Sequence, residues 1–313
     1  MSSRNLAIKI VLLSQAAVGI WGNGCLFLHY LVLYYKHCIL KPTDLILMHL
    51  TIANFMIILS KGVPHTMAAF GLKQFFGDFV CKLIFYVYRQ GRSMSISTTC
   101  LLSVFQAITI SARKSYWKIL KTKATKYLGL SISTYWILYM TVNFIFPVYV
   151  YAKWKGRNIT MRKTDFDYCA TIGCDEVTGS LYAALFMFPE VLLSVLMVWS
   201  SGSMIVSLYR HKQNVQYIHS TGVSWRTSAE NRATQSILVT ASTFITFYIL
   251  FAVFQGCVVL FYVPDWWLVD IQVVISLSFP TFGPYFMSHD SIMLRFCFFC
   301  LKNTKSHNII KSM

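Results

Sequence analysis

Long apolar segments alternate with short polar ones along the whole sequence. A helix that crosses the hydrocarbon core of a bilayer needs about 20 mainly apolar residues. Prolines inside such helices are tolerated because neighbouring groups satisfy the freed carbonyls. The pattern predicts an all-α membrane protein, a bundle of seven transmembrane helices. The predicted spans are about residues 7–35, 44–70, 81–110, 127–149, 180–208, 234–261 and 266–288.

The composition agrees with this interpretation. Only 12% of the residues are charged, against 56% hydrophobic, whereas a soluble domain has about 25% charged residues. The first apolar segment is too long for the core of a signal peptide, so we expect it to remain as a membrane helix. No internal repeat or second domain is found, which predicts one domain over residues 1–313, with a cytosolic tail over 289–313.

The basic residues give the bundle a direction. The net charge of +17 could indicate a nucleic-acid-binding protein, but the basic residues lie between the apolar segments rather than in one patch. One side of the expected bundle holds 16 of them, in segments near 36–43, 111–126, 209–233 and the tail, and the other side holds seven. The positive-inside rule then places the N-terminus outside the cell and the C-terminus in the cytosol.

Two further features lie on the expected outer side. Asn158 begins an Asn-Ile-Thr sequence, which is an acceptor for N-glycosylation, within the outer segment 150–179. Cys81, Cys169 and Cys174 lie on the same side, where disulfides persist. A bond from Cys81 to Cys169 would hold the outer segment over the bundle. Cys174 is the competing partner.

Among the charged residues inside the predicted spans, four deep ones are the candidates for function, because ionisable groups in the hydrocarbon are costly and often functional. At about 1.5 Å per helical residue, Lys61, Arg92 and Glu190 all lie about 14–16 Å below the outer surface. Arg89 lies one turn from Arg92, on the same helical face. We predict that these four residues line a water-accessible cavity, with Glu190 paired to an arginine. The alternative is that each pairs or snorkels only to hold the bundle together.

The expected cavity has three basic groups and one acid, which suits an anionic or electron-rich ligand. Four aromatic and amide side chains in the last two spans could complete the pocket, although ordinary packing is the alternative for each. These side chains are Phe251, Phe254, Gln255 and Gln272.

Motifs of the common enzyme classes are not found in the sequence. It has no zinc-protease helix, phosphate-binding loop, dinucleotide-binding glycine pattern or nucleophile elbow, so no catalytic residue and no cofactor is expected. Cys297 and Cys300 lack the second pair that a zinc site requires, so no metal site is expected either. These two cysteines are candidates for palmitoylation, with ordinary packing as the alternative.

Several stretches resemble the vomeronasal type-1 receptors, a family of seven-helix pheromone receptors coupled to G proteins. The similarity covers nearly the whole chain, and the long run from Ser95 to Ser111 is specific. The matching stretches are His65 to Leu72, Cys81 to Leu83 with Phe85 and Tyr86, Ser95 to Ser111, Tyr209 to Gln213 and Asn231 to Leu238.

The resemblance implies further properties. The family pattern fits a disulfide between Cys81 and Cys169, a glycan at Asn158 and basic residues at Arg89 and Arg92. It also implies a multi-pass protein of the plasma membrane that binds a small pheromone-like ligand and an inhibitory-class heterotrimeric G protein, with no nucleic-acid partner. A non-signalling receptor-like protein or a small-molecule carrier of the same fold is the alternative.

The sequence departs from the wider group of rhodopsin-like receptors at two places. The third span ends in Ile-Ser-Ala-Arg at Arg113, without the acid-arginine-tyrosine motif. The seventh has glycine at Gly283, before Pro284, in place of the asparagine of the asparagine-proline motif. Contact with the G protein is therefore predicted from charge alone, through the segments 111–126 and 209–233. The candidate residues there are Arg113, Lys114, Arg210 and Lys212.

Overall fold

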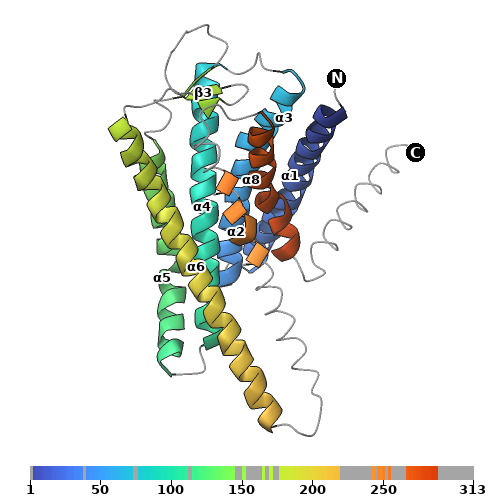
Figure 1. Ribbon diagram of the computed structural model, residues 1–313. Helices are drawn as coiled ribbons and strands as arrows, with labels where there is room; N and C mark the ends of the chain where they lie inside the picture. The colour runs from blue at the N-terminus through green and yellow to red at the C-terminus, as the bar shows by residue number, and fades with distance from the viewer. Residues whose placement is uncertain are drawn as a thin grey trace, which may run out of the picture.

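The computed structural model is a bundle of long helices with a small sheet at one end (Figure 1). It describes residues 3–37, 40–72, 77–111, 115–144, 150–152, 164–165, 169–171, 176–218, 242–243, 245–247, 249–250, 253–254 and 266–287. The helices are α1 (Ser3–His37), α2 (Pro42–Ile57), the π-helical turn η1 (Ile58–Gly62), α3 (Val63–Ala69), α4 (Asp78–Ser111), α5 (Ser115–Asn143), α6 (Glu176–Ile218) and α8 (Trp266–Met287).

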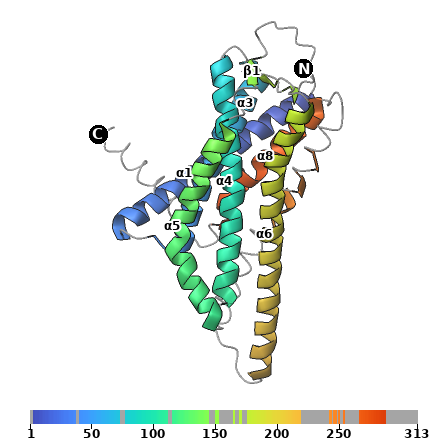
Figure 2. The same ribbon diagram turned by 90° about the vertical axis from the view of Figure 1, so that its left-hand side faces the viewer.

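Helix α4 lies in the middle of the bundle and packs against α2, α5 and α6, while α1 packs against α2 and α8 (Figures 1 and 2). At its centre, Leu50, Ile96, Met197 and Phe279 form a core from four different helices. Four helical segments within the described residues are long and apolar enough to cross a membrane: Leu6–Lys36, Pro42–Ala69, Asp78–Ile110 and Phe188–Ser207. The helical membrane fold expected from the apolar pattern is therefore supported for these four.

Three short strands are an addition to the all-helical expectation. Strands β1 (Val150–Ala152), β2 (Thr164–Asp165) and β3 (Cys169–Thr171) form an antiparallel sheet in the order β1-β3-β2. The sheet lies at the same end of the bundle as the N-terminus (Figure 1). The strands have two or three residues each, which is too short to give an alternating apolar pattern in the sequence.

Two helix boundaries differ from those expected. Helix α5 begins at Ser115 and ends at Asn143, so the expected loop over 111–126 is helical from Ser115. Residues 145–149 of the expected span 127–149 lie outside the described residues. Lysine, alanine and leucine are good helix formers, and lysines allow a membrane helix to continue into water. Helix α6 likewise extends to Ile218, past the expected end at about 208. Only parts of the expected sixth span, within 242–254, are described, and they are helical.

Two helices carry prolines whose missing amide hydrogen changes the local structure. An α-helical residue donates to the carbonyl four positions earlier, so Pro284 leaves the Pro280 carbonyl without its usual donor. Asn23 of α1 donates to that carbonyl from Nδ2 at 2.9 Å, and to Gly19 O at 2.8 Å. In the second span, the π turn η1 ends at Gly62, two residues before Pro64. We attribute the wider turn to Pro64, because its ring would crowd a regular α-helical carbonyl.

Gly91 allows α4 and α2 to approach closely. A methyl group at this position would lie 2.9 Å from the Ala53 carbonyl oxygen and 3.0 Å from Met56 Cβ. Backbone oxygen cannot move aside as a flexible side chain can. Small residues at helix crossings are a common means of packing in membranes, and Gly91 fits this role.

The Gly91→Ala substitution should therefore destabilise the bundle by about 1–3 kcal/mol through overpacking, despite alanine's higher helix propensity. The matched control is Gly129→Ala in α5, where a methyl group meets nothing within 4 Å. We expect the control to be neutral or slightly stabilising. Thermal unfolding of both variants in detergent measures the difference, and equal melting temperatures would contradict the packing argument.

Candidate functional site

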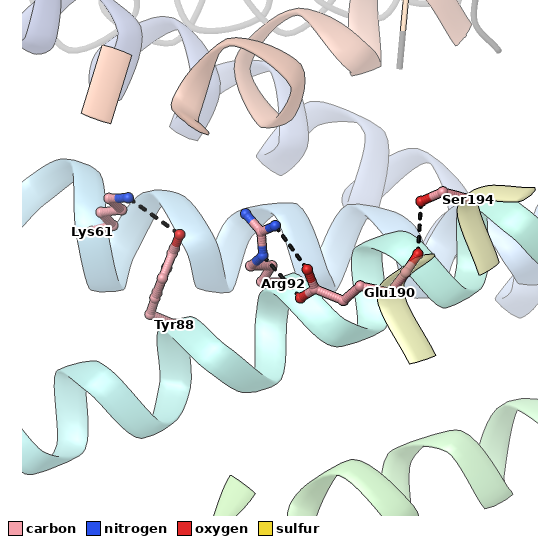
Figure 3. A network of polar contacts seen from close by, with 5 residues as sticks. All are labelled: Lys61, Tyr88, Arg92, Glu190 and Ser194. Carbon is pink, nitrogen blue, oxygen red and sulfur yellow. Dashed lines mark hydrogen bonds and ion pairs between the residues drawn. The ribbon is translucent and has the colours of Figure 1, made fainter. Parts of the chain in front are cut away.

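Lys61 lies within the π turn η1 and is only 5% exposed. Its ammonium donates to the Tyr88 hydroxyl of α4 at 3.2 Å and lies 4.7 Å from the centre of the Tyr88 ring. The ring face and the hydroxyl oxygen both stabilise a cation that has lost its water. Figure 3 shows the two side chains pointing toward each other from neighbouring helices.

An ion pair between α4 and α6 lies next to this contact. Arg92 donates from Nε to Glu190 Oε1 at 3.1 Å and from Nη2 to Glu190 Oε2 at 3.0 Å (Figure 3). Such two-pronged contacts are among the strongest that side chains form. The two side chains are 15% and 17% exposed. Ser194 donates to the backbone carbonyl of Glu190 at 2.7 Å, one turn further along α6.

Arg89 adds a third cation to this group of residues. It lies one turn before Arg92 on α4 and interacts electrostatically with Glu190, Arg92 and Tyr88. Lys61 and Arg92 also interact electrostatically. The cluster of Lys61, Arg89, Arg92 and Glu190 thus carries three basic groups and one carboxylate, and we call it the charged cluster. The structure brings together the residues that the sequence placed at one depth.

A second polar contact joins α3 to α8. His65 Nε2 lies 3.7 Å from Asp270 Oδ1, with His65 buried and Asp270 partly exposed. This contact is an ion pair whenever His65 is protonated. Since His65 follows Lys61 by one helical turn, the same inner face of the second span contacts both α4 and α8.

A disulfide joins Cys81, at the start of α4, to Cys169 in β3, with 5.9 Å between the Cα atoms. Both cysteines are fully buried and pack with Ala68 of α3. The bond is the pairing that the family pattern implies. It attaches the small sheet to the end of the bundle nearer the charged cluster, because Lys61 and Arg92 each lie less than a dozen residues from Ala68 and Cys81.

Comparison with known proteins agrees with the resemblance noted in the sequence. The model of the vomeronasal organ pheromone receptor family matches residues 6–299. The chain is 49% identical over 299 residues to vomeronasal type-1 receptor 4 of Homo sapiens, covering 95% of this chain and 99% of that one. It is 46% identical over 294 residues to vomeronasal type-1 receptor 2 of Homo sapiens, covering 94% and 74%.

The chain belongs to the vomeronasal organ pheromone receptor family. More distant members also match it: vomeronasal type-1 receptor 90 of Rattus norvegicus is 31% identical over 244 residues, covering 77% of each chain. The relatives are receptors and not enzymes, so the protein is a receptor.

The remaining expected site residues of this vomeronasal-family receptor fall into two groups. Gln272 is buried in α8, Phe254 is partly buried, and Arg210 is exposed near the end of α6. The backbone of Lys212 continues α6. The others lie outside the described residues and remain predictions: Asn158, Phe251, Gln255, Arg113, Lys114, Cys174, Cys297 and Cys300.

Tyr88 and Asp270 have roles that the sequence analysis missed. Tyr88 is one of many aromatic residues in the helices, and nothing in the local pattern marks it as the partner of Lys61. Asp270 could have been found, because it is an acid within the expected seventh span, and the cost of charge in hydrocarbon applies to it as much as to Glu190.

The ion pair between Arg92 and Glu190 should contribute to the stability of the receptor. Removing one partner of a buried pair leaves the other charge uncompensated, so Arg92→Gln or Glu190→Gln should each cost about 3 kcal/mol. The double variant Arg92→Gln/Glu190→Gln should be more stable than the sum of the single effects predicts. Thermal unfolding in detergent measures this cycle, with Arg210→Gln as an exposed control. Additive effects would mean that the two side chains do not interact.

Proposed function

We propose that the receptor crosses the plasma membrane seven times, with its N-terminus outside and its tail in the cytosol. The described helices beyond the four most apolar ones support this count. Helix α5 exposes large apolar side chains along its length, among them Leu130, Ile137 and Met140. An exposed apolar surface of this kind marks a contact with another protein or with a membrane, and in a family of membrane receptors the expected contact is lipid. Helix α8 and the helical residues within 242–254 supply the last two crossings.

The charged cluster is the proposed ligand site. The observation that carries this proposal is the convergence of three basic side chains on one carboxylate. Glu190 pairs with Arg92 and interacts electrostatically with Arg89, while Lys61 donates to the Tyr88 hydroxyl beside them. The positive potential of three basic groups around one acid would attract an added negative or electron-rich group. The ligand class proposed is therefore a small pheromone-like molecule with an anionic or electron-rich group, entering from the end that holds the sheet.

The opposite end of the bundle is the proposed contact for an inhibitory-class heterotrimeric G protein. Helix α6 extends beyond the other helices at that end (Figures 1 and 2), and Arg210 is exposed on it. The candidates Arg113, Lys114 and Lys212 add positive charge to the same side by their sequence positions. Basic surfaces attract acidic partners through long-range electrostatics.

Ligand-dependent nucleotide exchange tests the proposal. Purified receptor in lipid nanodiscs with an inhibitory-class G protein is screened with volatile and steroid-like compounds, each as a carboxylic acid and as the matching amide. We expect the acids to act at lower concentration, and Lys61→Met to raise their half-maximal concentration about tenfold or more, as the loss of a charged hydrogen bond implies. The control Lys36→Met removes an exposed charge at the C-terminal end of α1, away from the charged cluster.

The outcomes separate the two candidate functions. Ligand binding without any nucleotide exchange would favour a carrier or a non-signalling receptor-like protein. Acids and amides could instead stimulate nucleotide exchange at equal concentrations, with no effect of Lys61→Met. The ligand would then bind away from the charged cluster, and the receptor function would still hold.

The proposed orientation predicts a glycan at Asn158. Receptor made in mammalian cells should migrate faster in gels after enzymatic removal of N-linked glycans, and the Asn158→Gln and Thr160→Val variants should migrate at that position without treatment. Each variant destroys the acceptor sequence by a different change, so agreement between them excludes a folding artefact. A wild-type band that the enzyme does not shift, in receptor that reaches the cell surface, would contradict the prediction.

A further inference from the structure

The first turns of α5 carry a basic surface that the helical structure divides into two faces. Four lysines, at positions 118, 121, 123 and 126, lie between Ser115 and Tyr127 on one continuous helix. The sequence has no acidic residue between Asp78 and Asp165, so no neighbour on α5 neutralises them. Because the segment is helical, each lysine lies on a definite face of α5, either toward the other helices or away from them.

The bundle-facing side of α5 is set by its core contacts. Leu128 and Ile132 are buried against residues of α2 and α4, and Ala124 packs against the same cluster. These three residues recur every four positions, as expected for one face of a helix. Lys121 precedes Ala124 by three positions and Leu128 by seven, so it lies on this side, where it is partly buried.

The opposite side of α5 is apolar and exposed. Ile119, Leu130 and Ile137 are 57%, 66% and 64% exposed, and their spacings of 11 and seven residues keep them on one face. Lys123 and Lys126 are both exposed. Lys123 lies four positions after Ile119 and seven before Leu130, and Lys126 lies seven after Ile119 and four before Leu130. Both lysines are therefore on the same face of the helix as these apolar residues.

We propose that Lys123 and Lys126 bind the headgroups of anionic phospholipids in the leaflet at this end of the receptor. The inference rests on the proposed seven crossings, which put the exposed face of α5 in contact with acyl chains. At about 1.5 Å per residue, Lys126 and Lys123 lie about 6 and 10 Å along the helix from Leu130, toward the end of the bundle. If Leu130 contacts acyl chains, the two lysines are within reach of the polar headgroup region that borders the hydrocarbon. Lysine stems pack on apolar surface while the ammonium reaches the headgroups.

Tyr127 supports this placement. The Lys126 ammonium lies 5.7 Å from the centre of the Tyr127 ring, and Tyr127 is itself 53% exposed. Tyrosine gathers at the boundary between hydrocarbon and water. An aromatic ring and a lysine that contact each other on the lipid-facing side therefore mark the boundary between the acyl chains and the headgroups.

A protein partner would use a different side of the same helix. A G protein that docks on the end of the bundle meets the faces that α5 turns toward the other helices, where Lys121 lies, with Lys118 one turn before it. Lys123 and Lys126 point away from the bundle and into the plane of the membrane. Clusters of basic residues beside a membrane helix attract anionic lipids by this geometry.

The test compares two variants of equal charge, Lys123→Gln/Lys126→Gln and Lys118→Gln/Lys121→Gln. Full-length receptor is placed in bilayers of phosphatidylcholine containing spin-labelled phosphatidylserine or spin-labelled phosphatidylcholine, and the ratio of the two association constants is measured by electron spin resonance. We expect wild type to prefer phosphatidylserine about threefold or more, and the 123/126 variant to lose that preference. The 118/121 variant should keep most of it, and 1 M salt should abolish it in wild type.

Three results would overturn the proposal, and the first two are a wild-type ratio near one and equal ratios in the two variants. A third is loss of G-protein nucleotide exchange by the 123/126 variant in pure phosphatidylcholine, with its lipid preference unchanged, because the partner would then be the protein. Both leaflets have the same composition in this experiment, so the lipid preference itself does not depend on which end faces the cytosol or on whether the receptor signals.

Discussion

A membrane helix has no water to satisfy a backbone carbonyl that proline leaves without a donor, and two prolines set the inner arrangement of this receptor. The Pro280 carbonyl, freed by Pro284, takes its hydrogen bond from Asn23, which fixes α1 against α8. At Pro64 the backbone itself adapts, because the residues before this proline form the wider π turn η1. In both places the side chains that face the bundle depend on how the backbone adapts to the proline.

The π turn also aligns the charged residues. An α-helix turns about 100° per residue, so one extra residue in a turn rotates everything after it by about that angle. Lys61 lies inside η1, and His65 and Ala68 follow it in α3. Their contacts with Tyr88, Asp270 and the Cys81–Cys169 disulfide all depend on this rotation. A straight helix would turn this end of the second span toward different neighbours.

The sequence predicted those features that depend on distance along a helix. Lys61, Arg92 and Glu190 were placed at one depth because a helix rises evenly, and the ion pair between Arg92 and Glu190 follows from that depth. Features that depend on rotation about a helix were missed: Tyr88 as the partner of Lys61 requires the π turn, and a proline within a membrane helix does not by itself predict one. The start of α5 was missed for a different reason, since hydropathy reports the edge of the membrane and not the end of a helix. The lysines at 118–126 lower the hydropathy of the sequence, but the helix continues through them.

Helix α6 connects the charged cluster to the other end of the bundle. Glu190 and Arg210 are 20 residues apart on this one helix, or about 30 Å at 1.5 Å per residue. Pro189 lies beside Glu190, where a missing backbone bond makes bending easier. A ligand that competes with Glu190 for Arg92 would act on the helix at this point, and a small change in its direction there becomes a large displacement near Arg210. Helix α4, by contrast, packs against α2, α5 and α6, so a change at the Arg92–Glu190 pair is expected to alter α6 more than α4.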